Sequence, residues 1–406
     1  MFGEKKGRFR PAGGEISFWV SNRVTRVNEG SNSYSCRTMN VTGLFSVLYD
    51  SIMSNITHIR ALLLLLLLPA LIACGEPVER SAEPELVGIA QQENEAMEAE
   101  PVQGEALPGR LLFVRRGTVW LWEEREGRPL LGEGDAWQPA WSPNGTQIAY
   151  VERGESYSDV LLADAQGEFV DRLTANRSAA VSHSHERIYT SQWAFYPTWS
   201  PDGRRIAMAA QYGPPTGSPA FEYTLTLFTL PVAGGRRQQL YADDNAHVGP
   251  MVYDDSGSML IYTHIGISGE SEPELYRLAL TSQVSTPFPG APVPAYDPVF
   301  SPDGRWVAFA ARDEARTDIW VLPANATAGS NATPRRLTNQ GTARAPTFSP
   351  DGQFLAFLAI PPDKSGFELW VADVEIGENG TLRTTRPRQM TRDMRLDADS
   401  GLSWAP

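Results

Sequence analysis

The chain has 406 residues and a formal net charge of -13 at neutral pH. The charge is uneven, because residues 1–73 hold 8 Lys and Arg against 4 Asp and Glu, which leaves residues 74–406 with a net charge of -17. A chain this acidic is a poor nucleic-acid binder, since neutralising phosphates requires Lys and Arg. Its two cysteines, Cys36 and Cys74, match neither a disulfide framework nor a metal cluster.

Residues 53–73 have the pattern of a lipoprotein signal peptide. An uncharged run at 61–73 follows Arg60, and it is shorter than the roughly 20 apolar residues that a membrane-spanning helix needs. The run ends in Leu71-Ile72-Ala73-Cys74, which resembles a bacterial lipobox. The resemblance implies that Cys74 carries the lipid and starts the mature protein. The other interpretation is a buried hydrophobic helix with a chance cysteine.

The position of this signal leads to two further expectations. We expect translation to start at Met53, so that residues 1–52 are a mis-annotated upstream extension or are disordered. Gly75 follows the lipidated cysteine and is compatible with an outer-membrane anchor facing the periplasm. The lipid on Cys74 then holds the protein at the bacterial cell envelope, because two or three acyl chains suffice for stable anchoring.

Residues 74–109 are interpreted as the lipidated cysteine followed by an acidic, disordered tether. This stretch has nine acidic residues, one basic residue, Arg80, and no aromatic residue. So little apolar surface does not offset the entropy of ordering a chain. We therefore expect a solvated spacer here, with the folded domain at 110–406.

One phrase recurs through residues 110–406. It consists of a short apolar run ending in Trp or Phe, the turn sequence Ser-Pro-Asp-Gly, and a second run such as Ile-Ala-Tyr. Pro, Asp and Gly are the residues of a tight turn, so each phrase predicts a β-hairpin. Four clear copies and one degraded copy occur, at 139–145, 197–203, 298–304, 347–352 and 251–257. Repetition of this kind indicates a modular architecture.

Further strands are expected around the phrases. The domain opens with the runs 111–115, 118–122 and 128–131, and each repeat adds two more, for example 159–163 with 169–174 and 318–322 with 335–338. The phrase missing at the start appears at the end, as Leu402-Ser403-Trp404-Ala405-Pro406. A ring whose last strand completes the first sheet accounts for both facts and leaves no open edge. The sequence thus predicts an all-β, six-bladed β-propeller with four strands in each blade.

The repeated phrases resemble those of TolB-like β-propellers, which carry WD40-like repeats, and the resemblance covers residues 110–406. It implies the propeller fold. The function we expect is non-catalytic binding of a protein or peptide partner at the envelope, and a purely structural envelope component is a further alternative. Two oversized loops, at 176–196 and 211–222, are expected on one face, where functional residues concentrate. The candidate contact residues are Trp193, Phe195, Tyr196 and Tyr212, because aromatic side chains anchor interfaces.

An enzymatic function is the alternative hypothesis. His183 and His185 share one extended segment and His247 enters the next blade, and imidazole is a common metal ligand. Oligogalacturonate lyases are propellers that hold a metal in their channel, so a metal-dependent carbohydrate-active enzyme is conceivable by resemblance. The plainer interpretation is three surface histidines without a metal or other cofactor. No nucleophile elbow and no nucleotide-binding loop occurs in the sequence, which favours a binding protein.

Overall fold

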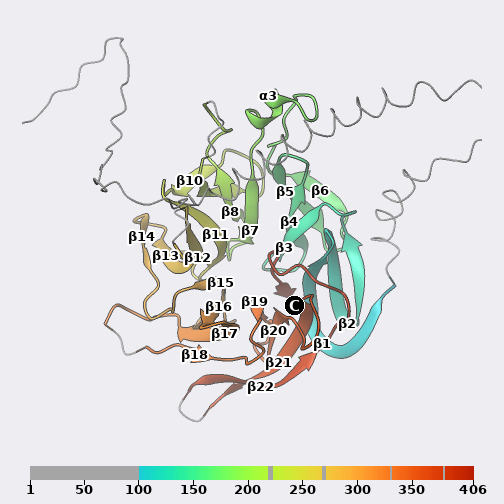
Figure 1. Ribbon diagram of the computed structural model, residues 1–406, viewed down its shortest axis with the longest axis vertical. Coiled ribbons are helices and arrows are strands. Elements are labelled where there is room, and N and C mark those ends of the chain that lie inside the picture. The colour runs from blue at the N-terminus through green and yellow to red at the C-terminus, as the bar shows by residue number, and fades with distance from the viewer. Residues whose placement is uncertain (1–99, 218–222, 268–270, 330–331, 378–379) are drawn as a thin grey trace, which may run out of the picture. The chain divides into compact units, whose positions relative to one another are not determined.

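The computed structural model describes residues 100–406, except 218–222, 268–270, 330–331 and 378–379. The upstream extension, the signal peptide, Cys74 and most of the tether lie outside the described residues. The described chain forms six antiparallel β-sheets arranged in a ring (Figure 1), which confirms the predicted six-bladed β-propeller. Within this part of the chain, no helix is both long enough and apolar enough to cross a membrane.

Five blades consist of four strands that follow one another in sequence, and the first strand of each is the inner one. Blade 1 contains β3 (Ala136–Trp141), β4 (Gln147–Arg153), β5 (Ser158–Asp164) and β6 (Phe169–Arg172). Blade 2 contains β7 (Ala194–Trp199), β8 (Arg205–Gln211), β9 (Leu225–Pro231) and β10 (Gln238–Tyr241). Blade 3 contains β11 (Ala246–Tyr253), β12 (Met259–Gly266), β13 (Glu274–Ala279) and β14 (Val284–Pro287).

Blades 4 and 5 repeat this order, and blade 6 closes the ring. Blade 4 contains β15 (Ala295–Phe300), β16 (Trp306–Asp313), β17 (Arg316–Pro323) and β18 (Arg335–Arg336). Blade 5 contains β19 (Arg344–Phe348), β20 (Phe354–Ala359), β21 (Glu368–Ile376) and β22 (Leu382–Gln389). Blade 6 joins β23 (Ser403–Ala405) to β1 (Val102–Arg115) and β2 (Thr118–Leu131). Both strands predicted at 118–122 and 128–131 lie within the single long element β2.

The two ends of the domain meet in blade 6, as the terminal phrase predicted. Leu111 of β1 pairs with Trp404 of β23, and Arg110 pairs with Ala405. The indole N–H of Trp404 donates a hydrogen bond to the carbonyl of Pro108 at 2.7 Å. The last strand therefore gives β1 a partner that an open array would lack.

The ordered domain begins earlier than the boundary predicted at residue 110, because β1 already starts at Val102. Val102 and Leu107 pack into a buried cluster that contains Trp120 and Trp122. Gly104 lies against Trp122, where a Cβ atom would come within 2.5 Å of the indole ring. A segment poor in apolar residues is thus ordered because the tryptophans of β2 supply the apolar surface.

The hydrophobic core lies between the blades. Each buried cluster joins residues of adjacent blades, as in the contact of Ala149 and Leu162 in blade 1 with Trp199 and Ile206 in blade 2. The inner-strand aromatic residue is large and the second-strand residue is often alanine, so neighbouring sheets approach closely. Only one short helix, α3 (His185–Ile188), is present among the described residues, in agreement with the predicted all-β fold.

The Ser-Pro-Asp-Gly segments form the turns between the first two strands of each blade. In blade 2, Ser200 Oγ donates to Asp202 Oδ1 at 2.6 Å and accepts from the N–H of Arg205 at 3.0 Å. Gly203 has a φ of +67°, which suits glycine. The aspartates are thus turn residues, as expected. In the degraded copy the serine and the aspartate have exchanged places: Asp254 stands at the first position of the turn, and Ser256 at the third donates its Oγ–H to Asp254.

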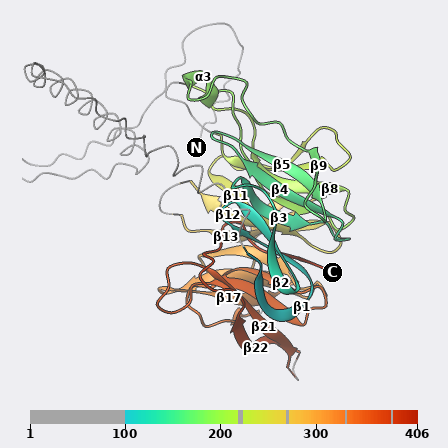
Figure 2. The ribbon, with the colours of Figure 1, turned by 90° about the vertical axis from the view of Figure 1, so that its right-hand side faces the viewer.

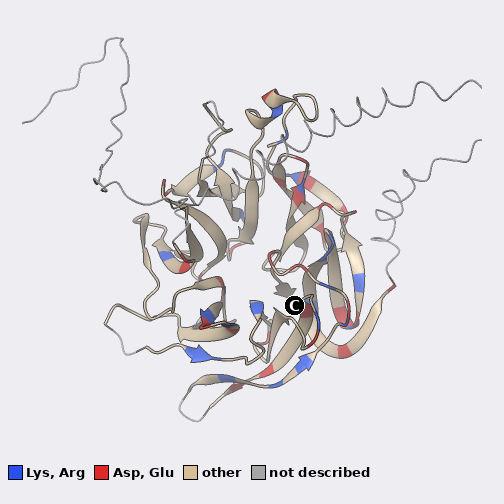
Figure 3. Ribbon diagram, viewed as in Figure 1, with Lys and Arg blue, Asp and Glu red and all other residues tan. Residues whose placement is uncertain are grey.

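The antiparallel strand order divides the propeller into two faces. The turns that follow the inner strands lie at one end of the ring axis, here called the turn face. The loops that lead into the inner strands, and those between second and third strands, lie at the other end, here called the loop face. The segment with α3 projects beyond the strands of its blade (Figure 2). Charged residues of both signs are scattered over the blades (Figure 3).

Candidate functional site

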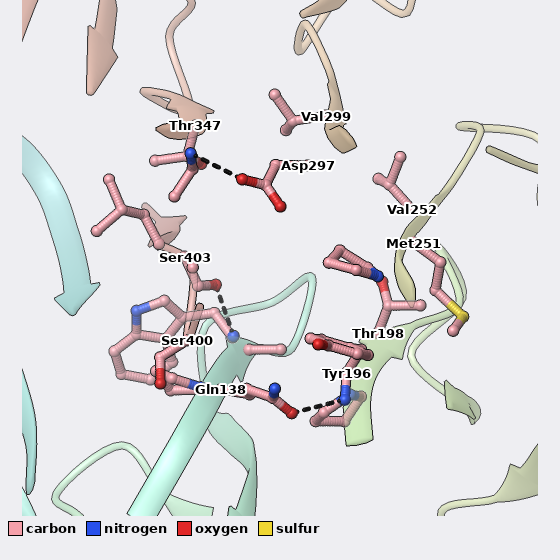
Figure 4. Close-up of a pocket in the computed structure, with 18 of the residues that line it drawn as sticks. Gln138, Tyr196, Thr198, Met251, Val252, Asp297, Val299, Thr347, Ser400 and Ser403 are labelled. Atoms are coloured by element: carbon pink, nitrogen blue, oxygen red, sulfur yellow. Dashed lines mark hydrogen bonds between the residues drawn. The ribbon is translucent and has the colours of Figure 1, made fainter. Parts of the chain in front are cut away.

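A cavity of about 300 Å³ lies at the centre of the ring and is lined by residues of all six inner strands. Figure 4 shows that residues as distant in sequence as Gln138, Met251 and Ser403 surround it. A second cavity of about 260 Å³ shares Tyr196, Pro250, Asp297 and Asp399 with the first. The loops before the inner strands contribute to both, so the two cavities form one opening towards the loop face.

The inner strands of blades 1 to 5 each contain a β-bulge where they line the central cavity. Every bulge holds a residue followed by proline, and the strand pairing shifts there. In four blades this residue is not glycine and still has a positive φ: Gln138 (+50°), Tyr196 (+55°), Asp297 (+56°) and Ala345 (+51°). Such conformations cost on the order of 1 kcal/mol or more and gather at functional sites. Bulges also redirect side chains.

Two of the bulge side chains connect neighbouring blades. Gln138 Oε1 accepts a hydrogen bond from the backbone N–H of Tyr196 at 2.8 Å. Asp297 Oδ2 accepts one from the backbone N–H of Ala345 at 3.2 Å. These contacts stabilise the cavity wall, because each gives a hydrogen-bond acceptor to a backbone N–H that the bulge has removed from strand pairing.

A charged group stands at the opening. Arg344 Nε lies 3.4 Å from Asp297 Oδ2, and Arg344 Nη1 lies 2.8 Å from Asp399 Oδ1. Burial raises the pKa of Asp297, against the opposing attraction of Arg344. Burial alone lowers the pKa of Arg344, but Asp297 and Asp399 outweigh it and raise the pKa. The opening therefore combines one guanidinium with two carboxylates of unequal exposure, 11% for Asp297 and 76% for Asp399.

The cavity wall also offers polar atoms that have no internal partner. The indole N–H of Trp141 and the hydroxyls of Thr263 and Ser400 are buried without a hydrogen bond within the described residues. All three residues line one of the two cavities. Buried polar groups are normally hydrogen-bonded. Each of these residues therefore contributes an unpaired polar atom beside the cavity.

A row of aromatic side chains leads away from the opening across blades 1 and 2. The guanidinium of Arg153 lies 4.9 Å from the ring of Trp137 and 6.0 Å from that of Phe195. Phe195 stacks on Trp193 with ring centroids 5.8 Å apart and tilts against Tyr196 at 6.1 Å. We call these five residues the aromatic row. The four aromatic side chains are partly exposed and Arg153 is exposed, so all five can contact a partner.

The structure places three of the four predicted contact residues in this row. Tyr196 lines both cavities, and burial with the nearby carboxylates raises its pKa to about 12. Tyr212 lies apart, in the loop after β8, where it is 64% exposed and packs edge-on against Tyr223. Its carbonyl accepts a hydrogen bond from Arg237, which also contacts Gln192. Arg237 thus ties the two long loops together.

The loop that carries α3 is attached to blade 1 through Glu155. Ser182 Oγ donates to Glu155 Oε2 at 2.6 Å, and His183 Nδ1 lies 2.7 Å from Oε1. The guanidinium of Arg187 is 3.6 Å from the same carboxylate. The hydrogen bond from Ser182, together with the charges of His183 and Arg187, lowers the pKa of Glu155.

The three histidines of the enzyme hypothesis have separate partners. His183 pairs with Glu155, the ring of His185 packs edge-on against Tyr189, and His247 Nδ1 accepts a hydrogen bond from the N–H of Leu225. The described residues contain no group of three or more His, Cys, Asp and Glu arranged to hold a metal ion.

Sequence reasoning missed Trp137, Arg153, Asp297, Arg344 and Asp399. The signal that points to two of these positions is the residue-proline pair near the start of each phrase, which occurs as Gln138-Pro139, Tyr196-Pro197, Asp297-Pro298 and Ala345-Pro346. Asp297 is the residue before the proline in blade 4. Arg344 comes one residue before the equivalent position in blade 5, which is occupied by Ala345. The strand itself was recognised, but its residue-proline pair was not recognised as a bulge that turns side chains into the cavity.

The fold and this central opening define the protein as a closed six-bladed β-propeller with a cavity reached from its loop face. TolB from Acinetobacter baumannii has a similar structure, with a TM-score of 0.50, 17% identity, and coverage of 79% of this chain and 71% of that one. A protein of Agrobacterium tumefaciens assigned as TolB matches with a TM-score of 0.47, 17% identity, and coverage of 69% and 89%. The likeness to TolB from Acinetobacter baumannii shows the propeller fold. No family model and no curated protein sequence matches it.

Proposed function

We propose that this protein is a lipid-anchored component of the bacterial cell envelope whose propeller binds a protein or peptide partner through the loop face. The observation that carries the proposal is the aromatic row of Trp137, Arg153, Phe195, Trp193 and Tyr196, which runs to the central opening. Tryptophan, tyrosine and arginine are the residues that dominate binding energy in protein interfaces. Hydrogen-bonding atoms in the opening supply the specificity that apolar contact lacks.

Extended peptides suit this arrangement best. The row ends at a cavity lined by bulged strands, so a flat protein surface would reach the row and leave the cavity wall unpaired. A peptide or a projecting loop would place one side chain in the opening and lay its neighbours over the row. The Asp297, Arg344 and Asp399 group would then select a partner side chain with a polar or cationic end.

The binding surface is tested by a photo-crosslinking residue at position 212, introduced into the full chain and irradiated in intact cells. Tyr212 is exposed on the loop face, and Val284, which is 55% exposed at the start of the outer strand β14, gives a matched control position. We expect one discrete crosslinked partner from position 212 and none from position 284. Equal crosslinking from both positions, or from position 284 only, would show that the partner binds elsewhere.

The anchor rests on the lipobox, which lies outside the described residues. Metabolic labelling with an alkyne fatty acid should mark the wild-type chain, whereas Cys74→Ala should be unlabelled and released from membranes by salt. Labelling of the Cys74→Ala chain would show that Cys74 is not the lipidated residue. The proposed binding through the loop face does not depend on this result.

A further inference from the structure

A separate cavity of about 390 Å³ lies at the rim of the loop face, in blade 6. One side is formed by the turn between β1 and β2, with Arg115 and Arg116, and the other by the segment that leads to β23, with Arg392. Trp120 of β2 also lines it. The aromatic row contributes no residue to this cavity, so the binding surface proposed above does not account for it.

Three arginines line this cavity in a chain that is acidic overall. Arg115 Nε donates to the carbonyl of Met394 at 3.3 Å, and its guanidinium lies 5.6 Å from the centre of the Trp120 ring. Burial and the neighbouring charge of Arg116 lower the pKa of Arg115, against the attraction of Glu368. Arg116 and Arg392 form no ion pair within the described part of the chain. This positive charge is therefore incompletely neutralised.

Trp120 provides an independent indication of a ligand. Its side chain is 1% exposed, and its indole N–H has no hydrogen-bond acceptor within the described residues. An indole N–H is only a donor, and a guanidinium is only a donor. A buried donor without an acceptor is uncommon in native proteins. Trp120 lines the cavity, and a group that pairs with its indole N–H and with the arginines has to be an acceptor.

The two carboxylates of the cavity do not fill this role. Asp393 Oδ1 lies 2.7 Å from Lys364 Nζ, and this contact lowers the pKa of Asp393. The Asp393 side chain is 72% exposed. Glu100 is exposed at the outer end of the cavity wall. Neither forms an ion pair with Arg115, Arg116 or Arg392 within the described chain.

We propose that this cavity is an oxyanion-binding site, in which Arg115, Arg116, Arg392 and the indole N–H of Trp120 hold a carboxylate or phosphate group of a ligand. Arginine suits both groups because its planar fork donates two parallel hydrogen bonds to paired oxygens. The cavity volume accommodates such a group with a small remainder of the ligand. The proposal does not depend on the partner of the aromatic row.

The test is a titration of the full-length chain with inorganic phosphate and, separately, with acetate, followed through the indole N–H resonances of ¹⁵N-labelled tryptophan. The Trp120 signal is assigned as the one that Trp120→Phe removes. We expect this signal to shift saturably with at least one of the two anions, and the stronger binder identifies the class of ligand. An Arg116→Gln variant should weaken binding roughly tenfold, because it removes a charge-assisted hydrogen bond to the anion.

Arg305→Gln is the matched control, because Arg305 is exposed on the turn face and the substitution removes the same charge. It should bind as tightly as wild type. Arg392→Gln gives a second variant in case Arg116→Gln disturbs the turn. The proposal is overturned if neither anion shifts the Trp120 signal, or if the shift is the same in both cavity variants as in Arg305→Gln.

Discussion

The carboxylate of Asp297 in blade 4 holds the backbone N–H of Ala345 in blade 5, at 3.2 Å. The two residues occupy equivalent positions, since each precedes the proline of its inner strand and each has a positive φ. The side chain of one bulge therefore stabilises the next bulge. Gln138 and Tyr196 repeat the relationship between blades 1 and 2. The cavity wall is thus built from contacts between repeats.

The first prediction concerns the pH dependence that Asp297 creates. Its folded pKa is raised by burial, so the folded state binds the proton more tightly than the unfolded state does. The stability contributed by the protonated form is present at acidic pH and declines as pH rises from the ordinary value of an aspartate, near 4, through the raised folded pKa. Asp297→Asn keeps an acceptor for Ala345 without the charge. We expect its melting temperature relative to wild type to increase with pH over this window.

Asp297→Ala is the matched variant, because it removes the charge and the acceptor together. It should melt below Asp297→Asn at every pH, since the Ala345 N–H is left unpaired. Thermal unfolding from pH 4 to 8 measures both differences. A difference between Asp297→Asn and wild type that does not change with pH would contradict the account of Asp297.

The second prediction concerns the loop with α3. The pKa of Glu155 is lowered first by the hydrogen bond from Ser182 and then by the nearby charges of His183 and Arg187. The contribution of this carboxylate is therefore present above the ordinary pKa of a glutamate and is lost as pH falls through the lowered folded pKa. Glu155→Ala should make residues 181–190 susceptible to limited proteolysis at neutral pH, with little change in melting temperature. Wild type should show the same cleavage only at strongly acidic pH, which requires an acid-active protease. Equal resistance of both chains at neutral pH would show that Glu155 does not attach the loop.

The third prediction concerns Glu368, which is 2% exposed at the start of β21. Its two oxygens accept hydrogen bonds from the hydroxyl of Thr391 at 2.6 Å and from the N–H groups of Met394 and Arg395 at 2.8 and 3.2 Å. Glu368→Ala leaves these donors unpaired, and each costs about 1–3 kcal/mol. We expect a loss of roughly 3 kcal/mol or more in the free energy of unfolding by urea. The exposed Glu123 gives the control variant Glu123→Ala, which should change the stability little. Similar stability of the two variants would contradict this role.

The sequence predicted the propeller because its repeat is local. Ser-Pro-Asp-Gly encodes a hairpin by turn chemistry alone, as Ser200 and Asp202 show, and the isolated phrase around Trp404 implied the closing strand. Asp297, Arg344 and Asp399 could not be assembled in the same way, because blade 4, blade 5 and the segment before β23 bring them together only after the ring closes. The ordering of Val102 could not be predicted for a similar reason, because the apolar surface that Val102 covers belongs to β2.

The measurement that tests the central claim most directly is the affinity of the partner crosslinked at position 212 for two single variants of the full chain. Phe195→Ala removes the middle of the aromatic row, and Val284→Ala removes an exposed apolar side chain of blade 3. The account predicts that Phe195→Ala weakens binding about tenfold or more and that Val284→Ala leaves it unchanged. Equal affinity of both variants, with both folded as judged by melting temperature, would contradict the assignment of the loop face as the binding surface.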